Sequence, residues 1–87
     1  MSGAYRIKIR ARVFKQLAAI PKKFRQRIEI KIDELAMDAY PPGCKKLEGE
    51  SNLWRIRIGD YRVIYSVDAN VRIVEIQNAG HRQSIYN

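Results

Sequence analysis

The sequence predicts an α+β fold in which two helices pack on one face of a mostly antiparallel sheet. Apolar residues recur at helical spacing from residue 12 to about residue 39, and beyond Pro41-Pro42-Gly43 they alternate with polar residues. A shorter alternating segment precedes the first helix. The resulting order of strand, helix, helix and three strands predicts a single domain that spans residues 1–87.

The first three predicted elements are a strand at residues 4–10, a helix at residues 12–19 and a helix from Pro21 to about Tyr40. In the strand, apolar and basic residues alternate, which is typical of a strand with one wet face. Proline is favoured in the first turn of a helix, whereas the residue before a proline disfavours helical geometry. The apolar stripe of the second helix consists of Phe24, Ile28, Ile32, Leu35, Ala36 and Ala39.

Three further strands are predicted at residues 53–58, 61–67 and 71–78, where the hydrophobic period is two. Gly59 and Asp60 fit a two-residue hairpin turn between the first two of these strands, because Gly is favoured at the first turn position. Side chains on one face of this hairpin are predicted to fill the core under the helices: Trp54, Ile56, Tyr61, Val63, Tyr65 and Val67.

The last strand has two possible registers. A two-residue turn at Ala69 and Asn70 would point Val74 and Ile76 into the core and bring Gln77 opposite Arg62. A three-residue turn would reverse the two faces of the strand. The sequence does not decide between these turns.

Three arginines, Arg55, Arg57 and Arg62, are predicted to lie on the sheet face that the helices leave open. The hairpin register places Arg57 directly opposite Arg62, and such like-charged pairs destabilise a sheet. The whole chain has 17 Lys and Arg against 9 Asp and Glu, a formal net charge of +8. A strong positive charge favours polyanionic partners, and a phosphate group is the simplest ligand for this face.

Composition excludes several other classes of protein. Cys44 is the only cysteine, so an internal disulfide is impossible and a reducing cytoplasm is the expected setting. No apolar run approaches the roughly 20 residues of a membrane span. No His and Cys spacing fits a zinc site and no carboxylate cluster fits magnesium, so chemistry without a metal or cofactor is expected.

Three segments, 47–49, 61–65 and 80–86, resemble the RelE family of bacterial toxin–antitoxin ribonucleases. The resemblance covers essentially the whole chain and implies a RelE-like fold with a short C-terminal helical tail. It also implies an endoribonuclease that cuts messenger RNA in the ribosomal A site and is silenced by a cognate antitoxin. The related ParE toxins share the fold but act on DNA gyrase, so architecture alone does not decide between these activities.

The resemblance assigns a basic site to this chain. Arg55, Arg57 and Arg62 match basic residues on the hairpin strands, Arg82 matches an arginine of the tail, and Tyr86 matches the tail tyrosine. Arg55 and Arg57 stand where the best-studied members have lysines, and the interval from Arg82 to Tyr86 is shorter than in those members. Because guanidinium groups stay charged, these arginines are interpreted as electrostatic clamps on phosphate rather than as bases.

RNA supplies its own nucleophile, the 2′-hydroxyl, so the protein needs only to hold the phosphate and to move protons. Tyr86 is the candidate base, because surrounding positive charge favours its phenolate, and its structural alternative is an anchor on the sheet edge. His81 is a candidate acid or base, with local packing in a turn as an equally weighted alternative. Arg82 is a second clamp or an assistant to the acid. All these groups are expected to converge with the arginines around one scissile phosphate.

Two further basic clusters are candidates for RNA backbone contacts. Lys45 and Lys46 precede the hairpin, and Lys22, Lys23 and Arg25 lie at the start of the second helix, where a solvated helical face is the structural alternative. A plain RNA-binding module remains a competing interpretation of the whole chain. It predicts salt-dependent binding without cut products.

Overall fold

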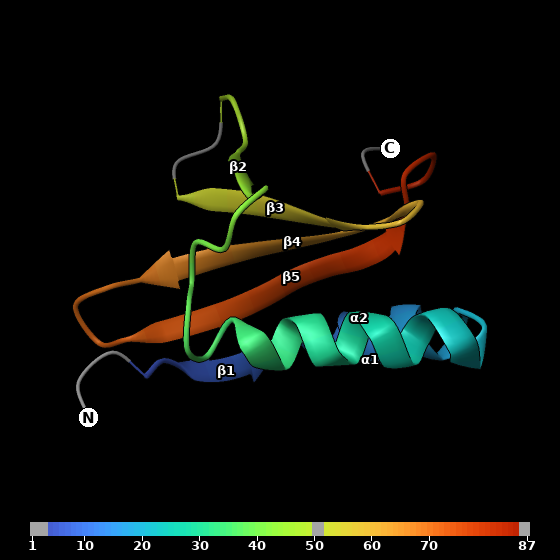
Figure 1. Ribbon diagram of the computed structural model, residues 1–87, viewed down its shortest axis with the longest axis horizontal. Helices are drawn as coiled ribbons and strands as arrows, with labels where there is room; N and C mark the ends of the chain where they lie inside the picture. Colours follow the sequence, from blue (N-terminus) through green and yellow to red (C-terminus); the bar gives the residue numbers. More distant parts are fainter. Residues whose placement is uncertain (1–3, 50–51, 86–87) are drawn as a thin grey trace.

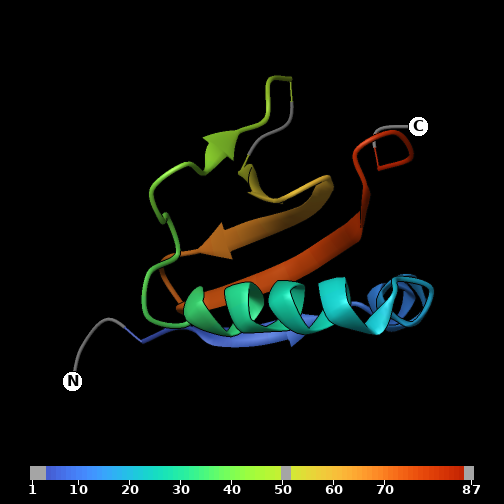
Figure 2. The ribbon, with the colours of Figure 1, turned by 45° about the vertical axis from the view of Figure 1, so that its right-hand side comes forward.

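In residues 4–49 and 52–85, which the computed structural model describes, a five-stranded sheet carries two helices on one face (Figures 1 and 2). The elements are β1 (Arg6–Ile9), α1 (Ala11–Ala18), α2 (Lys22–Glu34), β2 (Lys45–Lys46), β3 (Leu53–Ile58), β4 (Tyr61–Asp68) and β5 (Ile73–His81). The strand order is β1-β5-β4-β3-β2, with β1 parallel to β5 and the other pairs antiparallel. The predicted α+β class and mostly antiparallel sheet are confirmed.

Helix α2 ends at Glu34, earlier than the predicted end near Tyr40. The N–H groups that follow donate to carbonyls three residues earlier, which tightens the chain into a narrower turn. The carbonyl of Ala36 accepts a hydrogen bond of 2.7 Å from the N–H of Tyr5, so the segment after the helix is tied to the start of β1. The prolines at 41 and 42 lack the N–H groups that a longer helix would need.

The core lies between the helices and the sheet. Most of the apolar residues predicted for it are buried, but Trp54 and Tyr61 are only partly buried and pack at its margin. The buried side chains of the two helices and three central strands include Val13, Leu17, Ile28, Ile32, Leu35, Ile56, Val63, Tyr65, Val67, Val74 and Ile76. Burial of side chains of this size contributes about 1.5–3 kcal/mol each, which makes this core the main stabilising element of the fold.

Tyr65 anchors the segment after α2 to the sheet. Its side chain is fully buried, and its hydroxyl donates a hydrogen bond of 2.8 Å to the carbonyl of Ala39. Burial raises the pKa of the Tyr65 phenol well above its ordinary value. Tyr65 therefore ionises at a lower pH in the unfolded chain than in the folded chain. Its contribution to stability is lost as the pH rises above about 10.

The variant Tyr65→Phe should lower the free energy of unfolding by about 1–3 kcal/mol, because the buried Ala39 carbonyl loses its donor. Urea denaturation at neutral pH measures the effect. Tyr40→Phe is the matched control, since Tyr40 is 44% exposed and should change stability by less than about 0.5 kcal/mol. Equal denaturation midpoints for Tyr65→Phe and the wild type would contradict this role.

The β3–β4 hairpin has the predicted register. Arg57 lies opposite Arg62, and Ile58 lies opposite Tyr61 on either side of a two-residue turn. Gly59 has a φ of 59°, which glycine adopts without strain. This turn fixes which side chains of β3 and β4 share a face.

The β4–β5 register differs from both registers considered for the last strand. Asp68 pairs with Ile73, so the connection is longer than expected, and an irregularity beside Ile64 and Tyr65 leaves Gln77 without a partner in the ladder. Gly80 lies opposite Arg62 in place of Gln77. Val74 and Ile76 are still buried as the two-residue turn would place them, because the longer connection preserves the alternation before the bulge.

The strand β2 was not predicted. It contains only Lys45 and Lys46, and it pairs antiparallel with the first half of β3 (Figure 1). Two residues are too few to show a periodic pattern, so this strand could not be predicted from alternation. In the part of the chain that the structure describes, neither helix is long and apolar enough to cross a membrane.

Candidate functional site

Four cationic side chains lie on the sheet face opposite the helices. Arg55, Arg57 and Arg62 share this face because Arg57 and Arg62 are directly paired and Arg55 stands two residues before Arg57. Lys45 joins them, since it pairs with Arg55 across β2 and β3. We call these four residues the basic face. The predicted grouping of the three arginines is confirmed, and Lys45 extends it.

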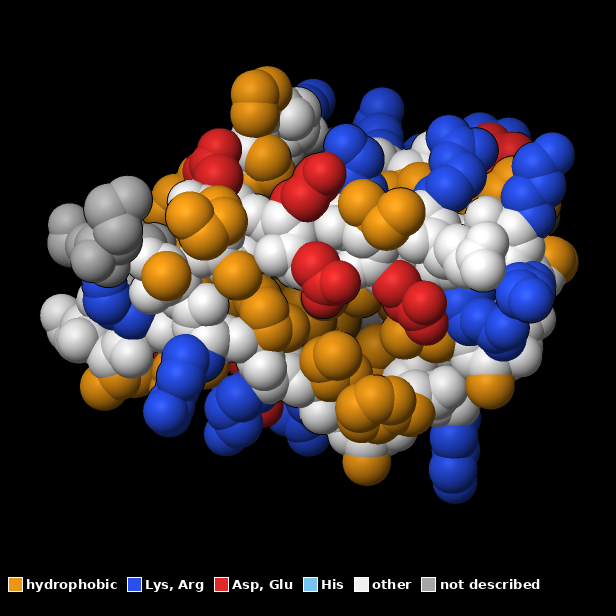
Figure 3. All heavy atoms as spheres, turned by 60° about the horizontal axis from the view of Figure 1, so that its bottom comes forward, with side chains coloured by type: hydrophobic (Ala, Val, Ile, Leu, Met, Phe, Trp, Pro, Cys, Tyr) orange, Lys and Arg blue, Asp and Glu red, His pale blue; other side chains and the backbone are white. Residues whose placement is uncertain are grey.

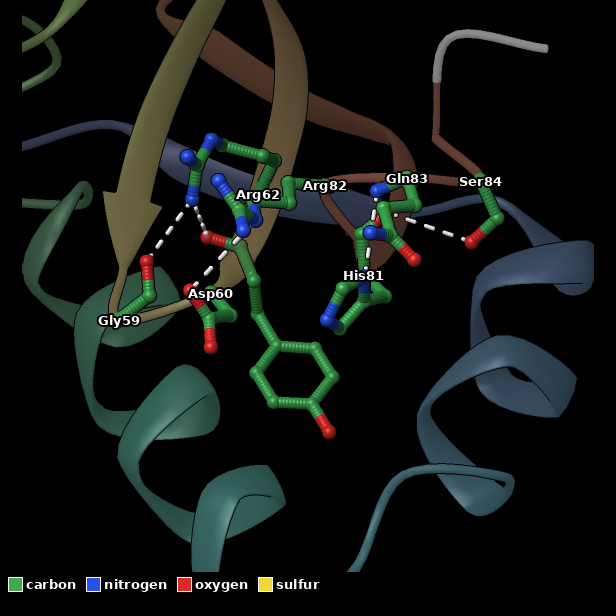
Figure 4. Close-up of polar contacts among 8 residues, drawn as sticks. Gly59, Asp60, Arg62, His81, Arg82, Gln83 and Ser84 are labelled. Atoms are coloured by element: carbon green, nitrogen blue, oxygen red, sulfur yellow. Dashed lines mark hydrogen bonds and ion pairs between the residues drawn. The ribbon is translucent and has the colours of Figure 1, made fainter.

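The guanidinium of Arg62 is held at the hairpin turn (Figure 4). Its Nη1 donates to the carbonyls of Gly59 and Tyr61 at 2.9 and 3.0 Å. On the neighbouring strand, the Nε of Arg55 is shielded from solvent and has no hydrogen-bond partner within residues 4–49 and 52–85. A bound anion would give this donor the partner that it lacks.

Arg82, the arginine of the tail, contacts the same turn. The N–H of Arg82 donates to the carbonyl of Asp60 at 2.8 Å, and its Nε lies 3.7 Å from the Asp60 carboxylate (Figure 4). Both side chains of this ion pair are more than half exposed, so solvent weakens it. The backbone bond therefore fixes the position of the tail, and the segment 59–61 contacts both Arg62 and Arg82. Sequence analysis did not identify Asp60 as a contact of this site.

His81 does not converge with the arginines, and that expectation was wrong. It pairs with Tyr61, and the two rings meet edge to face with centroids 5.7 Å apart. The ring of Tyr61 in turn packs against the ring of Phe24 in α2, with centroids 5.4 Å apart. His81 therefore lies on the helix side of the sheet. The cause is the bulge at Gln77, because one extra residue exchanges the faces of every later residue of β5.

The imidazole of His81 is engaged locally. Its Nδ1 accepts a hydrogen bond of 3.2 Å from the N–H of Gln83 (Figure 4). The described part of the tail, residues 82–85, is a hydrogen-bonded turn rather than the helix that was expected, with the N–H groups of Ser84 and Ile85 donating to the His81 carbonyl. Tyr86, the candidate base, lies outside the described residues.

The other basic residues that were predicted to contact RNA lie in two places. Lys46 pairs with Trp54, so its side chain is on the face opposite Lys45. Lys22 and Lys23 are exposed at the start of α2. Figure 3 shows Lys and Arg side chains gathered at the right-hand end of the molecule, the end at which α2 begins in Figure 1. Arg25, two residues after Lys23, is partly buried. Lys22, Lys23 and Arg25 therefore form a cationic region at the start of α2, and Lys46 lies apart from it on β2.

The described residues contain no group of three or more His, Cys, Asp or Glu side chains that could hold a metal ion together. Cys44 is partly buried. The chemistry that the described site itself supports is recognition of an anion by several guanidinium groups on one face, which match phosphate oxygens in geometry and charge.

Comparisons with known proteins agree on one group. A family model described as "ParE toxin of type II toxin-antitoxin system, parDE" matches residues 7–86. Toxin RelE3 of Methanocaldococcus jannaschii is 31% identical over 77 residues, which cover 84% of this chain and 85% of that protein. The RelE chain in the archaeal RelE–RelB complex from Pyrococcus horikoshii OT3 superposes with a TM-score of 0.81 at 36% identity, covering 93% of this chain and 98% of that one. A chain of the RelB–RelE antitoxin–toxin complex from Methanococcus jannaschii superposes with a TM-score of 0.73 at 28% identity, covering 91% of this chain and 94% of that one.

Proposed function

The chain belongs to the RelE/ParE superfamily of type II toxin–antitoxin toxins, and from that membership we propose that it is an endoribonuclease that cuts messenger RNA in the ribosomal A site. The observation that carries the proposal is the basic face, on which Lys45, Arg55, Arg57 and Arg62 gather with Arg82 at the adjoining turn. Cations in this number suit a phosphate whose charge increases during reaction.

In the proposed reaction, the 2′-oxygen of the RNA attacks the adjacent phosphorus and the bond from phosphorus to the 5′-oxygen breaks. The Tyr86 phenolate takes the proton of the 2′-hydroxyl, and the departing 5′-oxygen takes a proton from solvent. Arg55, Arg57 and Arg62 stabilise the dianionic phosphorane, while Arg82 stabilises charge on the leaving oxygen. The products are a 2′,3′-cyclic phosphate and a 5′-hydroxyl, and the reaction needs no metal or cofactor.

The proposed partners follow from the same membership. RelE proteins related to this chain occur in complexes with RelB antitoxins, so a cognate antitoxin is the proposed inhibitor here. Four basic residues outside the basic face are proposed to contact the backbones of ribosomal and messenger RNA: the exposed Lys22 and Lys23, together with Arg25 and Lys46. A protein that acts on translating ribosomes would work in the cytoplasm.

One experiment separates the candidate functions. The purified protein is added to ribosomes programmed with a defined message, and new 5′ ends are mapped on that message. Cuts that require the ribosome support the proposal. An intact message together with trapped gyrase–DNA complexes would favour the ParE alternative. Binding to RNA without cuts would favour a plain RNA-binding module.

The variant His81→Phe should keep message cleavage within about threefold of the wild type, because the imidazole packs on Tyr61 away from the basic face. Loss of a general acid or base would instead lower the cleavage rate about 10²–10⁴-fold. Single-turnover cleavage on programmed ribosomes measures the difference, and the aromatic replacement preserves the edge-to-face contact. A hundredfold loss in a variant that is still folded would return His81 to the catalytic site.

A further inference from the structure

A groove separates the outer edge of β3 from α2. One part is a hollow of about 410 Å³, lined by Lys31 and Glu34 of α2, by the segment 41–43, by Lys45 of β2 and by residues 55–57 of β3. The other part, about 260 Å³, is lined by Arg27 and Ile30 of α2 and by Ile58 and Gly59, and it shares Lys31 and Arg57 with the first. The two hollows thus lie end to end. We call them together the edge groove.

The sheet edge inside this groove has unused hydrogen-bonding capacity. Ile58 and Tyr61 flank a two-residue turn and so exchange hydrogen bonds with each other, which turns the N–H and C=O of Arg57 away from β4. The neighbouring strand β2 covers β3 only as far as Arg55, where Lys45 pairs with it. The Arg57 backbone is therefore left facing the groove, and an open strand edge is a template for another chain.

The walls of the groove favour an acidic polypeptide. Ile30 is 58% exposed, and with the prolines at 41 and 42 it provides apolar contact area. Arg27, Lys31 and the basic-face residue Arg57 supply positive charge. The carboxylate of Glu34 already pairs with Lys31 at 3.4 Å, so the net charge of the lining is positive.

We propose that the edge groove binds an extended acidic segment of the cognate antitoxin, whose backbone pairs with the N–H and C=O of Arg57. Addition of a strand to a sheet edge is a recurring mode of peptide recognition, and the edge geometry fits a polypeptide backbone better than a nucleic acid. The inference rests on the proposed toxin function. It also couples inhibition to the active site, because the strand that holds the antitoxin is the one that carries Arg55 and Arg57.

The first test measures binding of the purified cognate antitoxin to variants of the full-length toxin. Ile30→Glu and Lys31→Glu should each weaken binding about tenfold or more, since they place negative charge on the lining. Both variants should still cut message at the wild-type rate and should escape inhibition at antitoxin concentrations that silence the wild type. Val71→Glu and Lys15→Glu are matched controls on other surfaces, and Val71 is 59% exposed, like Ile30.

The second test measures amide hydrogen exchange in isotope-labelled toxin, first alone and then in complex with unlabelled antitoxin. The Arg57 N–H should exchange about tenfold more slowly in the complex, whereas the Arg55 N–H, which already faces β2, should change little. Unchanged exchange at Arg57, or wild-type affinity in both groove variants, overturns the proposal. Variants that bind antitoxin normally but lose message binding also overturn it and assign the groove to RNA. Because antitoxin binding is read without cleavage, failure of the nuclease assay leaves this test intact.

Discussion

Replacement of Arg62 by alanine is expected to slow message cleavage about 10²–10³-fold, the usual effect of removing one charged donor from a reacting oxyanion. Arg62 is central to the basic face, since it pairs with Arg57 and its guanidinium is held at the turn by the carbonyls of Gly59 and Tyr61. The side chain lies off the hydrophobic core. Stability should therefore change by less than about 1 kcal/mol, and relief of the repulsion with Arg57 would offset part of any loss.

Single-turnover cleavage on programmed ribosomes and thermal unfolding are measured together for this variant. Lys8→Ala is the matched control, because Lys8 pairs with Glu75 at the other end of the sheet and should leave the cleavage rate unchanged. Normal cleavage by Arg62→Ala would remove the basic face from the mechanism. A parallel loss of activity and stability would show instead that Arg62 serves the fold.

Replacement of Tyr86 by phenylalanine is expected to lower the cleavage rate about 10²–10⁴-fold, the range for loss of a general base. The reason is chemical, since the guanidinium groups of the basic face remain protonated and cannot accept the proton of the 2′-hydroxyl. Binding to ribosomes should stay within about threefold of the wild type, because phenylalanine keeps the ring. This separates a role in proton transfer from a role in docking.

The control for that variant is Tyr40→Phe, which removes an exposed phenol in the segment after α2. It should cut message normally. If Tyr86→Phe also cuts normally, another group or solvent takes the proton. If it loses ribosome binding along with cleavage, Tyr86 is an anchor.

Local signals in the sequence were sufficient for the hairpin and its arginines. Gly59 and Asp60 determine a two-residue turn, and strict alternation on either side then determines which residues face each other, so Arg57 and Arg62 were placed correctly. The buried stripe of α2 was equally predictable, because Ile28, Ile32 and Leu35 recur at helical spacing.

Features that depend on distant contacts were not predictable. The bulge at Gln77 arises from how β4 and β5 fit together, and it moved His81 to the helix side of the sheet. The early end of α2 accompanies a bond from Tyr5 to the Ala36 carbonyl, between residues far apart in the chain. The contact between Asp60 and Arg82 likewise joins two loops that carry no shared sequence pattern.

The facing pair of Arg57 and Arg62 has a consequence for how this protein behaves in solution. Dissolved ions usually weaken surface electrostatics that favour a fold, but here they screen a repulsion that opposes it. Sulfate or phosphate at millimolar concentration should therefore raise the melting temperature more than chloride at equal ionic strength, since an anion seated between two guanidinium groups binds only the native protein.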